Sequence, residues 1–270
     1  MRTGTTISPA VRHAALFSHE DLPDPPDGHP FRLVRRPGYA IGGFLGATFG
    51  TVGVTAIEPD ALENAVDDVR SVLAEQGMGK AVWFVADASP PGLLEALQAR
   101  GIAPSDEPPF EPHFTAMALV AAPEPGPGDV VARLAASFEE FVAAHRIADD
   151  AFDVGEADRE AFEAKSRAMW EFELDEGDYR TYVALIDGEV IAFAAAIAGA
   201  NSTYLSGGGT RADSRGRGAY RSLVRARWDA AVERGTPALT VGAGAMSAPI
   251  LERLGFEQVG RIDCLVDKFE

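Results

Sequence analysis

The sequence is poor in cysteine, in positive charge and in long apolar runs, and each shortage excludes a class of protein. Cys264 is the only cysteine, so neither an intrachain disulfide nor a cysteine-based metal site is expected, and a reduced cytoplasm fits best. The most apolar stretches, 39–57 and 190–200, are interrupted by glycine or too short to cross a bilayer. Residues 1–20 lack the apolar core of an export signal. We therefore expect no membrane span and no secretion signal.

The charge balance argues against polyanionic partners. Lysine and arginine total 24 against 41 aspartates and glutamates, a net charge of −17. Such a surface disfavours nucleic acid and anionic membrane, so an anionic ligand has to be held by a local site. The chain has 270 residues, of which 46% are hydrophobic and 24% charged, as in ordinary globular proteins of one large or two modest domains.

The first half reads as an arm followed by a small α/β unit. Residues 22–30 hold four prolines, which excludes helix or sheet there, and we assign 1–30 to an N-terminal arm. The proline and glycine run at 123–128 predicts a boundary, giving domains at 31–125 and 126–270. The elements predicted in the first domain are two strands within 39–57 that turn near Gly46 or Gly50, helices at 60–76 and 89–100, and strands at 81–86 and 113–121.

The second half predicts helices packed on a mixed, mostly antiparallel sheet, an α/β (α+β) fold. Its surest feature is a hairpin of strands 181–186 and 189–198 joined at Asp187-Gly188, a dipeptide that favours a tight turn. The other elements predicted are helices at 131–146, 156–173, 218–234 and 248–254, strands at 203–210 and 238–241, and two terminal strands within 256–269 that turn near Gly260.

A glycine-containing segment between the strand ending at Thr210 and the next helix predicts an anion site. Gly216 and Gly218 allow the backbone to bend and approach a ligand, and the first amides of the helix point outward unpaired. Residues 211–227 contain six arginines and one aspartate, the only strongly positive segment. A phosphate fits there. The arginines at 221, 225 and 227 are equally compatible with a solvated helix face. The dinucleotide motif GxGxxG would need a third glycine at position 221, where Arg221 stands, and the phosphate-loop motif GxxxxGK is absent, so neither kind of nucleotide site is favoured.

Two motifs in this half resemble the GCN5-related N-acetyltransferases (GNAT). Arg215 to Tyr220, RGRGAY, is similar to the family's acyl-CoA-binding loop, although Tyr220 departs from the usual last glycine or alanine. Ser247 to Phe256, SAPILERLGF, resembles a later helix of the family that ends in Leu-Gly-Phe. The resemblance covers roughly 128–270. The segment AVWFVADASPPGLLEALQARG with FTAMALV resembles the shortened first copy of two-domain members, which lacks the glycine loop. Tandem GNAT-like units with a degenerate N-terminal copy are therefore expected.

The resemblance implies an N-acetyltransferase that uses acetyl-CoA as co-substrate, needs no metal, and acts on a small amine or a peptide. The strand ending at Thr210 is expected to splay from its neighbour, and backbone groups of Gly209, Thr210, Arg211 and Ala212 to pair with the pantetheine arm. The loop residues Arg215, Gly216, Arg217, Gly218, Ala219 and Tyr220 are expected to hold the pyrophosphate. A nucleic acid or a membrane is not an expected partner, and a homodimer stays open.

The proton-transfer residues depart from the family's pattern. Where members place a tyrosine as the acid, this chain has Leu251. Where many use a glutamate on the central strand, it has Tyr204 and Ser206, which become the catalytic candidates. A phenol has an ordinary pKa near 10, so Tyr204 would position a water rather than remove a proton. His145, at the end of an apolar helix face, is typical of a satisfied buried imidazole or a helix-end charge.

Two other functions remain open. Loss of the acid and the base is compatible with a catalytically silent CoA-binding sensor or scaffold. Small residues at Ala194–Ala196 would leave room for a longer acyl-CoA, or they are ordinary strand packing. The acidic residues from Glu171 to Asp178 are typical of a solvated loop, and they are also compatible with a site that attracts a cationic amine.

Overall fold

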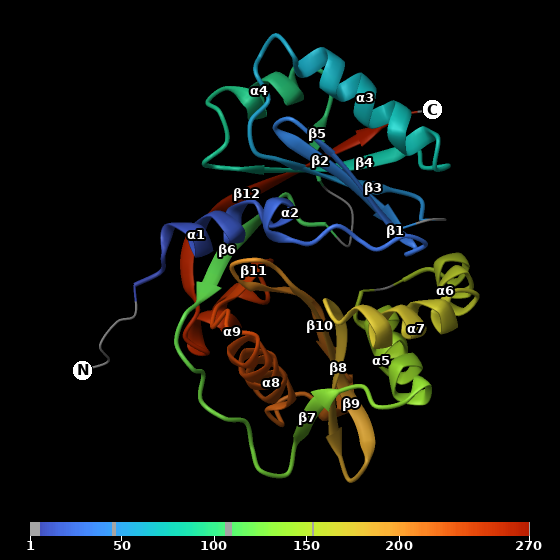
Figure 1. The fold of residues 1–270 in the computed structure, drawn as a ribbon, viewed down its shortest axis with the longest axis vertical. Coiled ribbons are helices and arrows are strands. Elements are labelled where there is room, and N and C mark those ends of the chain that lie inside the picture. The colour runs from blue at the N-terminus through green and yellow to red at the C-terminus, as the bar shows by residue number, and fades with distance from the viewer. Residues whose placement is uncertain (1–5, 45–46, 106–109, 153, 270) are drawn as a thin grey trace.

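A single mixed sheet runs through both halves of the chain. The computed structural model describes residues 6–44, 47–105, 110–152 and 154–269, and the sheet within them has twelve strands (Figure 1). The pairs β3–β4 and β10–β11 are parallel and the others antiparallel. The predicted mixed, mostly antiparallel sheet is confirmed.

The elements follow the order expected for two similar units. Those of the first half are α1 Pro9–Leu16, α2 Ser18–Asp21, β1 Phe31–Arg36, β2 Tyr39–Phe44, β3 Gly50–Val54, α3 Leu62–Ala74, β4 Lys80–Ala86, α4 Leu93–Gln98, β5 Ala103–Pro104 and β6 His113–Leu119. Those of the second half are β7 Val131–Leu134, α5 Phe138–Ala151, α6 Glu156–Glu163, α7 Ser166–Glu176, β8 Tyr179–Ile186, β9 Glu189–Ala198, β10 Thr203–Thr210, the 3₁₀ turn Ala212–Ser214, α8 Ala219–Glu233, β11 Leu239–Ala243, α9 Ala248–Arg253 and β12 Glu257–Lys268.

The two halves exchange their last strands. The order across the sheet is β1-β2-β3-β4-β12-β6-β11-β10-β9-β8-β7, so β12, at the end of the chain, pairs with β4 and with the short β5 of the first half. In return β6 pairs with β11 of the second half (Figure 1). Leu265 of β12 joins the core of the first half beside Trp83 and Val52. The division at residues 125 and 126 stays a prediction, since the sheet is continuous across it.

Helices cover the sheet on both faces. In the first half α3 packs its apolar stripe, Leu62, Val66, Val69 and Leu73, onto β2 to β4 and β12. In the second half α8 packs on one face of β8 to β11, and α5 and α7 pack on the other (Figure 1). Within the described ranges no helix is long and apolar enough to cross a membrane.

The N-terminal segment is not the arm predicted from the sequence. Pro9–Leu16 is helical, with the Ser8 hydroxyl accepting from the Val11 amide as an N-cap and Pro9 in the first turn. Its buried Val11 and Ala15 pack on the middle of the sheet. The proline-rich stretch after Asp21 lacks helix and strand, as expected. The helix was missed because its apolar face is short and is stabilised by the sheet.

Asp21 ties this segment to the second half, and it supplies a test of that attachment. Its carboxylate is 7% exposed and accepts from the Asn201 amide at 2.9 Å, from Asn201 Nδ2 at 2.7 Å and from Ser202 Oγ at 3.0 Å. Replacing Asp21 by alanine leaves these donors without a charged acceptor, so we expect a loss of about 3 kcal/mol in the free energy of unfolding. Urea denaturation measures it. Asp24→Ala, which removes an exposed ion pair with Arg35, is the control and should cost less than about 1 kcal/mol. Equal losses would contradict this account of Asp21.

Three predictions for the second half were wrong in detail. Residues 131–134 form β7, paired with β8, because Ser137 caps the helix and starts it only at Phe138. The helix predicted at 156–173 is two helices, α6 and α7. The two terminal strands are one, β12, in which the register shift between Gln258 and Gly260 is a bulge.

Other local predictions are confirmed. The hairpin turns at Asp187 and Gly188, whose φ angles are 51° and 85°, as a two-residue turn of this type requires. The strand at 203–210 is found as predicted. Gly46, one of the two predicted turn positions in the first half, lies outside the described residues, and Gly50 begins β3.

Candidate active site

The central strands β10 and β11 separate shortly after they meet. Their parallel pairing joins only Thr203 to Leu239 and Tyr204 to Thr240. Beyond Tyr204, β10 continues to Thr210 paired with β9 alone, with a bulge between Ser206 and Gly208. Gly207 at the bulge has φ +80°. The backbone edge from Leu205 onward is therefore open for an added strand or an extended ligand, in agreement with the splay that the family resemblance implies.

The loop that follows β10 presents unpaired amides. The Arg211 amide still donates to Ile191 O at 2.9 Å, and Ser222 donates to Gly218 O at 3.1 Å. Between them, within the described part of the chain, the amides of residues 215–221 donate to no protein acceptor. Gly216 and Gly218 both have φ near +80°. A Cβ on Gly216 would meet open space, whereas one on Gly218 would lie 2.6 Å from Pro127. The amides and the start of α8 together suit an anion.

The arginines of this segment are less uniformly exposed than their number suggests. Arg227 does not lie on a solvated helix face, one of the two alternatives left open by the sequence: it is 0% exposed, and burial lowers its pKa. Its guanidinium donates to the carbonyls of Leu223 and Ala195, at 3.1 and 3.2 Å. Three others are paired with carboxylates on the surface, Arg211 with Asp213 at 2.7 Å, Arg217 with Asp129 at 3.1 Å and Arg225 with Asp229 at 2.8 Å.

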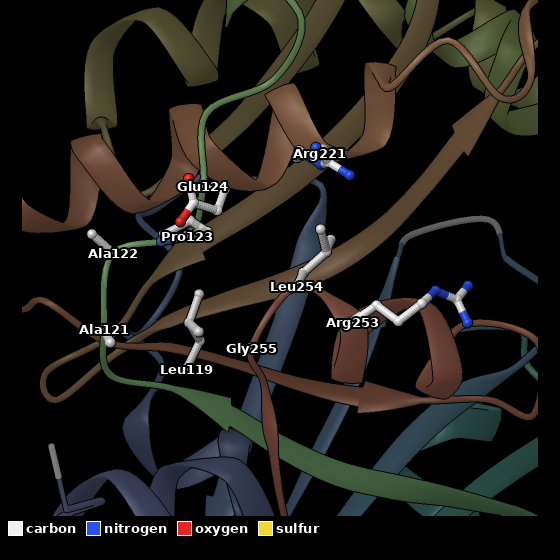
Figure 2. Close-up of a pocket in the computed structure, with 9 residues that line it drawn as sticks. All are labelled: Leu119, Ala121, Ala122, Pro123, Glu124, Arg221, Arg253, Leu254 and Gly255. Atoms are coloured by element: carbon white, nitrogen blue, oxygen red, sulfur yellow. The ribbon is translucent and has the colours of Figure 1, made fainter. Parts of the chain in front are cut away.

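Arg221 lies beside a small pocket next to the loop. Figure 2 shows Arg221 on α8 and Arg253 on α9, with Leu254 between them and Glu124 of the linker nearby. The pocket has a volume of about 150 Å³. Neither arginine forms an ion pair with another described residue, so Arg221 in the first turn of α8 and Arg253 at the end of α9 both lack a carboxylate partner there.

A larger cavity, of about 440 Å³, lies between the two halves. Its floor is the face of β8 to β10 that carries two cross-strand rows, Thr181, Ala195 and Ser206 in one, Tyr179, Ile197 and Tyr204 in the other. The opposite wall comes from the first half and is largely aromatic. Both catalytic candidates, Tyr204 and Ser206, therefore project into one cavity, where β10 begins to separate from β11.

The phenol of Tyr204 stays protonated near neutral pH. Burial raises its pKa, and its hydroxyl is within hydrogen-bonding reach of the Gly242 amide and of the Ser18 side chain. Ser18 belongs to the N-terminal helical segment, so that segment forms part of the cavity wall beside Tyr204. A protonated phenol can donate a hydrogen bond or a proton, and it is a poor base.

His145 also lines this cavity, and its environment corrects the sequence interpretation. It lies inside α5, not at the helix end, with its ring 4.1 Å from Phe162 and 4.4 Å from Phe141. Burial lowers its pKa to about 4, so the imidazole is neutral. Its Nε2 is buried with no hydrogen-bond partner among the described residues, whereas the sequence predicted a satisfied ring. A buried polar atom without a partner is rare in folded proteins, and a role at a functional site is one explanation for it.

The sequence left two environments open for Glu173, a solvated loop or a site that attracts a cationic amine, and the structure contradicts the loop. Glu173 lies on α7, and its carboxylate accepts from the Thr181 amide at 2.7 Å and from Thr181 Oγ1 at 2.8 Å. Burial raises the pKa of Glu173 to about 7. The hydrogen bonds from Thr181 and the positive charge of Arg180 oppose this rise. The side chain thus holds α7 on β8 at the border of the cavity.

The raised pKa of Glu173 predicts a pH-dependent stability. Because the folded-state pKa lies above the ordinary value of 4.5, the native state binds this proton more tightly than the unfolded chain. The contribution to stability is present below pH 4.5 and is lost as the pH rises through 7, about 3 kcal/mol in all. Glu173→Gln keeps an acceptor and a donor for Thr181 without the charge. We expect it to raise the free energy of unfolding at pH 8 by about 2 kcal/mol and to change it little at pH 4.

Urea denaturation at the two pH values checks this expectation. Glu171→Gln, at an exposed position of the same helix, is the matched control. It should change the free energy of unfolding little at either pH. A Glu173→Gln variant less stable than the parent at pH 8 would show that the charge itself holds α7 in place.

Two further positions considered from the sequence have ordinary structural places. Leu251, at the family's tyrosine position, is 0% exposed and packs with Phe256 and Val241 in the core under α8. Ala194 and Ala196 pack against α8, which is the strand-packing interpretation, whereas Ala195 lines the large cavity on the opposite face, so the alternative of a longer acyl chain stays open.

Comparison with known proteins agrees with this architecture. Residues 122–247 match the family model described as an acetyltransferase (GNAT) domain. Among solved structures, a GCN5-related N-acetyltransferase from Kribbella flavida is 20% identical with a TM-score of 0.63, over 97% of this chain and 96% of that one. A tandem GNAT protein from the clavulanic acid biosynthesis pathway is 16% identical with a TM-score of 0.60, over 98% and 90%.

A third structure, a GCN5-related N-acetyltransferase from Sphaerobacter thermophilus, is 16% identical with a TM-score of 0.59, over 96% of this chain and 91% of that one. No curated protein matches the chain. At these identities the solved structures establish the fold alone. Residues 122–247 therefore match a GNAT acetyltransferase domain, and the chain shares its fold along its length with a tandem GNAT protein.

Proposed function

We propose that the protein is an acetyl-CoA-dependent N-acetyltransferase that acetylates an amine of a small molecule or peptide. The GNAT domain supports acetyl transfer in general. The observation that carries the finer proposal is the open edge of β10 leading directly into a loop of unpaired amides at 215–221. An extended arm that ends in a diphosphate matches this sequence of sites, and acetyl-CoA is such a molecule.

The residues present fit acetyl-CoA by the chemistry of their donors. The backbone of Gly209 to Ala212 offers hydrogen bonds to the amides of a pantetheine arm. The amides of Arg215 to Arg221, with the N-terminus of α8, suit the diphosphate. Arg221 and Arg253 offer cations to a further phosphate. When bound, acetyl-CoA supplies an acetyl thioester for attack by the amine.

The reacting end requires a hydrogen-bond donor and a way to remove a proton. Leu251 supplies neither, because it is a buried apolar side chain. Tyr204 remains protonated, so we assign it to donating a hydrogen bond near the thioester or to holding a water. Ser206 lies beside it on the same face, next to the bulge. The unpaired backbone at the bulge suits polarisation of the thioester carbonyl.

Calorimetry with acetyl-CoA, followed by assays of CoA release over a panel of amines, tests the proposal. We expect binding in the micromolar range and CoA release with at least one amine. The absence of binding heat would refute the acetyl-CoA site. Binding without CoA release over the panel would instead favour the catalytically silent CoA-binding protein.

A further inference from the structure

The walls of the large cavity are suited to an aromatic body. Phe31 and Phe44, from β1 and β2, have ring centroids 4.9 Å apart, and Phe84 and Phe110 lie 6.0 Å apart. All four line the cavity, facing the floor formed by β8 to β10. A dry apolar cavity of about 150 Å³ accepts a benzene ring, so about 440 Å³ leaves room for an aromatic body and its substituents.

The cavity offers little charge compensation to a cation. Among the described residues that line it, Glu173 is the only carboxylate, and both of its oxygens accept from Thr181. The one guanidinium, Arg180, donates to the carbonyls of Glu173 and Gly177 at the end of α7. His19 is bound to Thr55 through Nε2 at 2.9 Å. Because burial raises the pKa of Glu173 to about 7, its carboxyl group is only partly ionised at neutral pH, so an ammonium group buried here would gain little counter-charge for the hydration that it loses.

Besides Tyr204 and Ser206, His145 offers a polar atom over the middle of the floor. At one end of α5, Phe141 packs with Val183 and Leu185 of β8. At the other end, Phe152 and Ala151 lie against Gly207 and Gly209 of β10. The helix thus crosses the face from β8 to β10, which places His145 above β9, near the row that ends at Ser206. Its unpartnered Nε2 belongs to a neutral ring and can accept a hydrogen bond in one tautomer.

We propose that the cavity binds an arylamine as the acetyl acceptor, with its ring against the phenylalanines of the first half and its amino group donating a hydrogen bond to His145 Nε2. This inference rests on the proposed function. The nitrogen of an arylamine is uncharged at neutral pH, because its lone pair is delocalised into the ring. It therefore enters an apolar cavity without desolvating a charge, and it needs no base before it attacks.

The chemistry balances with the groups present. The amine nitrogen forms a bond to the thioester carbonyl carbon, and the carbon–sulfur bond breaks to release the CoA thiolate. The nitrogen loses one proton to His145 Nε2, and the imidazolium then passes that proton through water to the thiolate, so the ring returns to its neutral form. A weakly basic imidazole suffices, because the nitrogen of an arylamine becomes strongly acidic once it has attacked. The products are an N-acetylarylamine and CoA.

Two isomeric amines test the charge preference directly. 4-Ethylaniline and 2-phenylethylamine have the same formula and nearly the same size, but only the second is protonated at neutral pH. Calorimetric titration of the protein without acetyl-CoA should show 4-ethylaniline binding at least about tenfold more tightly. Equal affinities, tighter binding of 2-phenylethylamine, or no binding of either would overturn the proposal.

The variant His145→Phe tests the contact with the amino group. Phenylalanine keeps the ring stack with Phe141 and Phe162 and removes the unpaired nitrogen, so the variant should fold, which circular dichroism and urea denaturation check. We expect 4-ethylaniline to bind about fivefold to tenfold more weakly, as for one lost hydrogen bond. Ethylbenzene, which fills the same space without an amino group, should bind the variant and the parent alike. An equal effect on both ligands would assign His145 a packing role and overturn the contact.

These titrations omit acetyl-CoA, so their outcome is separable from the proposed function. Arylamine binding in a protein that fails to bind acetyl-CoA would refute the acetyltransferase proposal alone. If the protein binds acetyl-CoA but prefers 2-phenylethylamine, the acetyltransferase proposal stands and the arylamine proposal is refuted.

Discussion

Replacing Gly216 by glutamate should weaken acetyl-CoA binding by at least about 100-fold while leaving the protein folded. Position 216 faces open space at the centre of the amide-lined loop, so the new carboxylate fits sterically and lies where the diphosphate is expected. Like charges a few ångströms apart in a partly solvated site repel by several kcal/mol, and each 1.4 kcal/mol is a factor of ten in affinity. Calorimetry with acetyl-CoA measures the change.

Gly235→Glu is the matched control at the other end of α8. Its φ of +83° nearly equals the +81° of Gly216, and a Cβ there also meets nothing within 4 Å. The two variants therefore carry similar backbone strain, about 1 kcal/mol, and urea denaturation should show similar losses. Only Gly216→Glu should lose affinity. If both variants bind acetyl-CoA as the parent does, the loop is not the diphosphate site.

The loop could be predicted from the sequence because its signals are local. A strand, two glycines and a helix start lie within a dozen or so residues, and unpaired amides follow from helix geometry alone. The hairpin at Asp187-Gly188 is of the same kind, since the dipeptide selects the turn. The splay of β10 from β11 also agrees with expectation, although that expectation came from the family resemblance.

The features that escaped the sequence depend on contacts between distant residues. β7 follows a helical pattern at Val131 and Leu134, but pairing with β8 and the cap at Ser137 override it. Burial of Asp21 requires Asn201 and Ser202, far along the chain. No local pattern distinguishes Arg227, under β9, from its exposed neighbours on α8.

The candidate site also contains some features with local sequence signals and others that depend on distant contacts. Tyr204 and Ser206 could be named from their place on the central strand, and they do face the cavity. The cavity itself could not be predicted, because its aromatic wall comes from the first half of the chain. His145 and Glu173 acquire their shifted pKa values only when α5 and α7 pack on the sheet. The assignments of acetyl-CoA contacts, cytoplasmic location and a homodimer stay predictions.

Neither half of the chain should fold when produced alone. A fragment of residues 1–125 lacks β12, which lies between β4 and β6 and carries Leu265 into the core of that half. A fragment of residues 126–270 lacks β6, the partner of β11, and leaves β12 without β4. We expect each fragment alone to show no cooperative urea transition, and an equimolar mixture refolded together to recover one. Far-ultraviolet circular dichroism and hydrogen exchange measure both outcomes.

Grafting the missing strand distinguishes strand exchange from general instability. Residues 1–125 followed by a flexible linker and residues 257–269 restore the pairing of β12 with β4 and β5, so this fragment should unfold cooperatively. The same fragment with Leu265→Asp should not, because the carboxylate would enter the core beside Trp83. Cooperative unfolding of 126–270 alone would show two self-sufficient domains. If neither fragment unfolds cooperatively alone and the grafted fragment does, the exchanged strands hold the aromatic wall over β10. The first half is then a fixed part of the cavity.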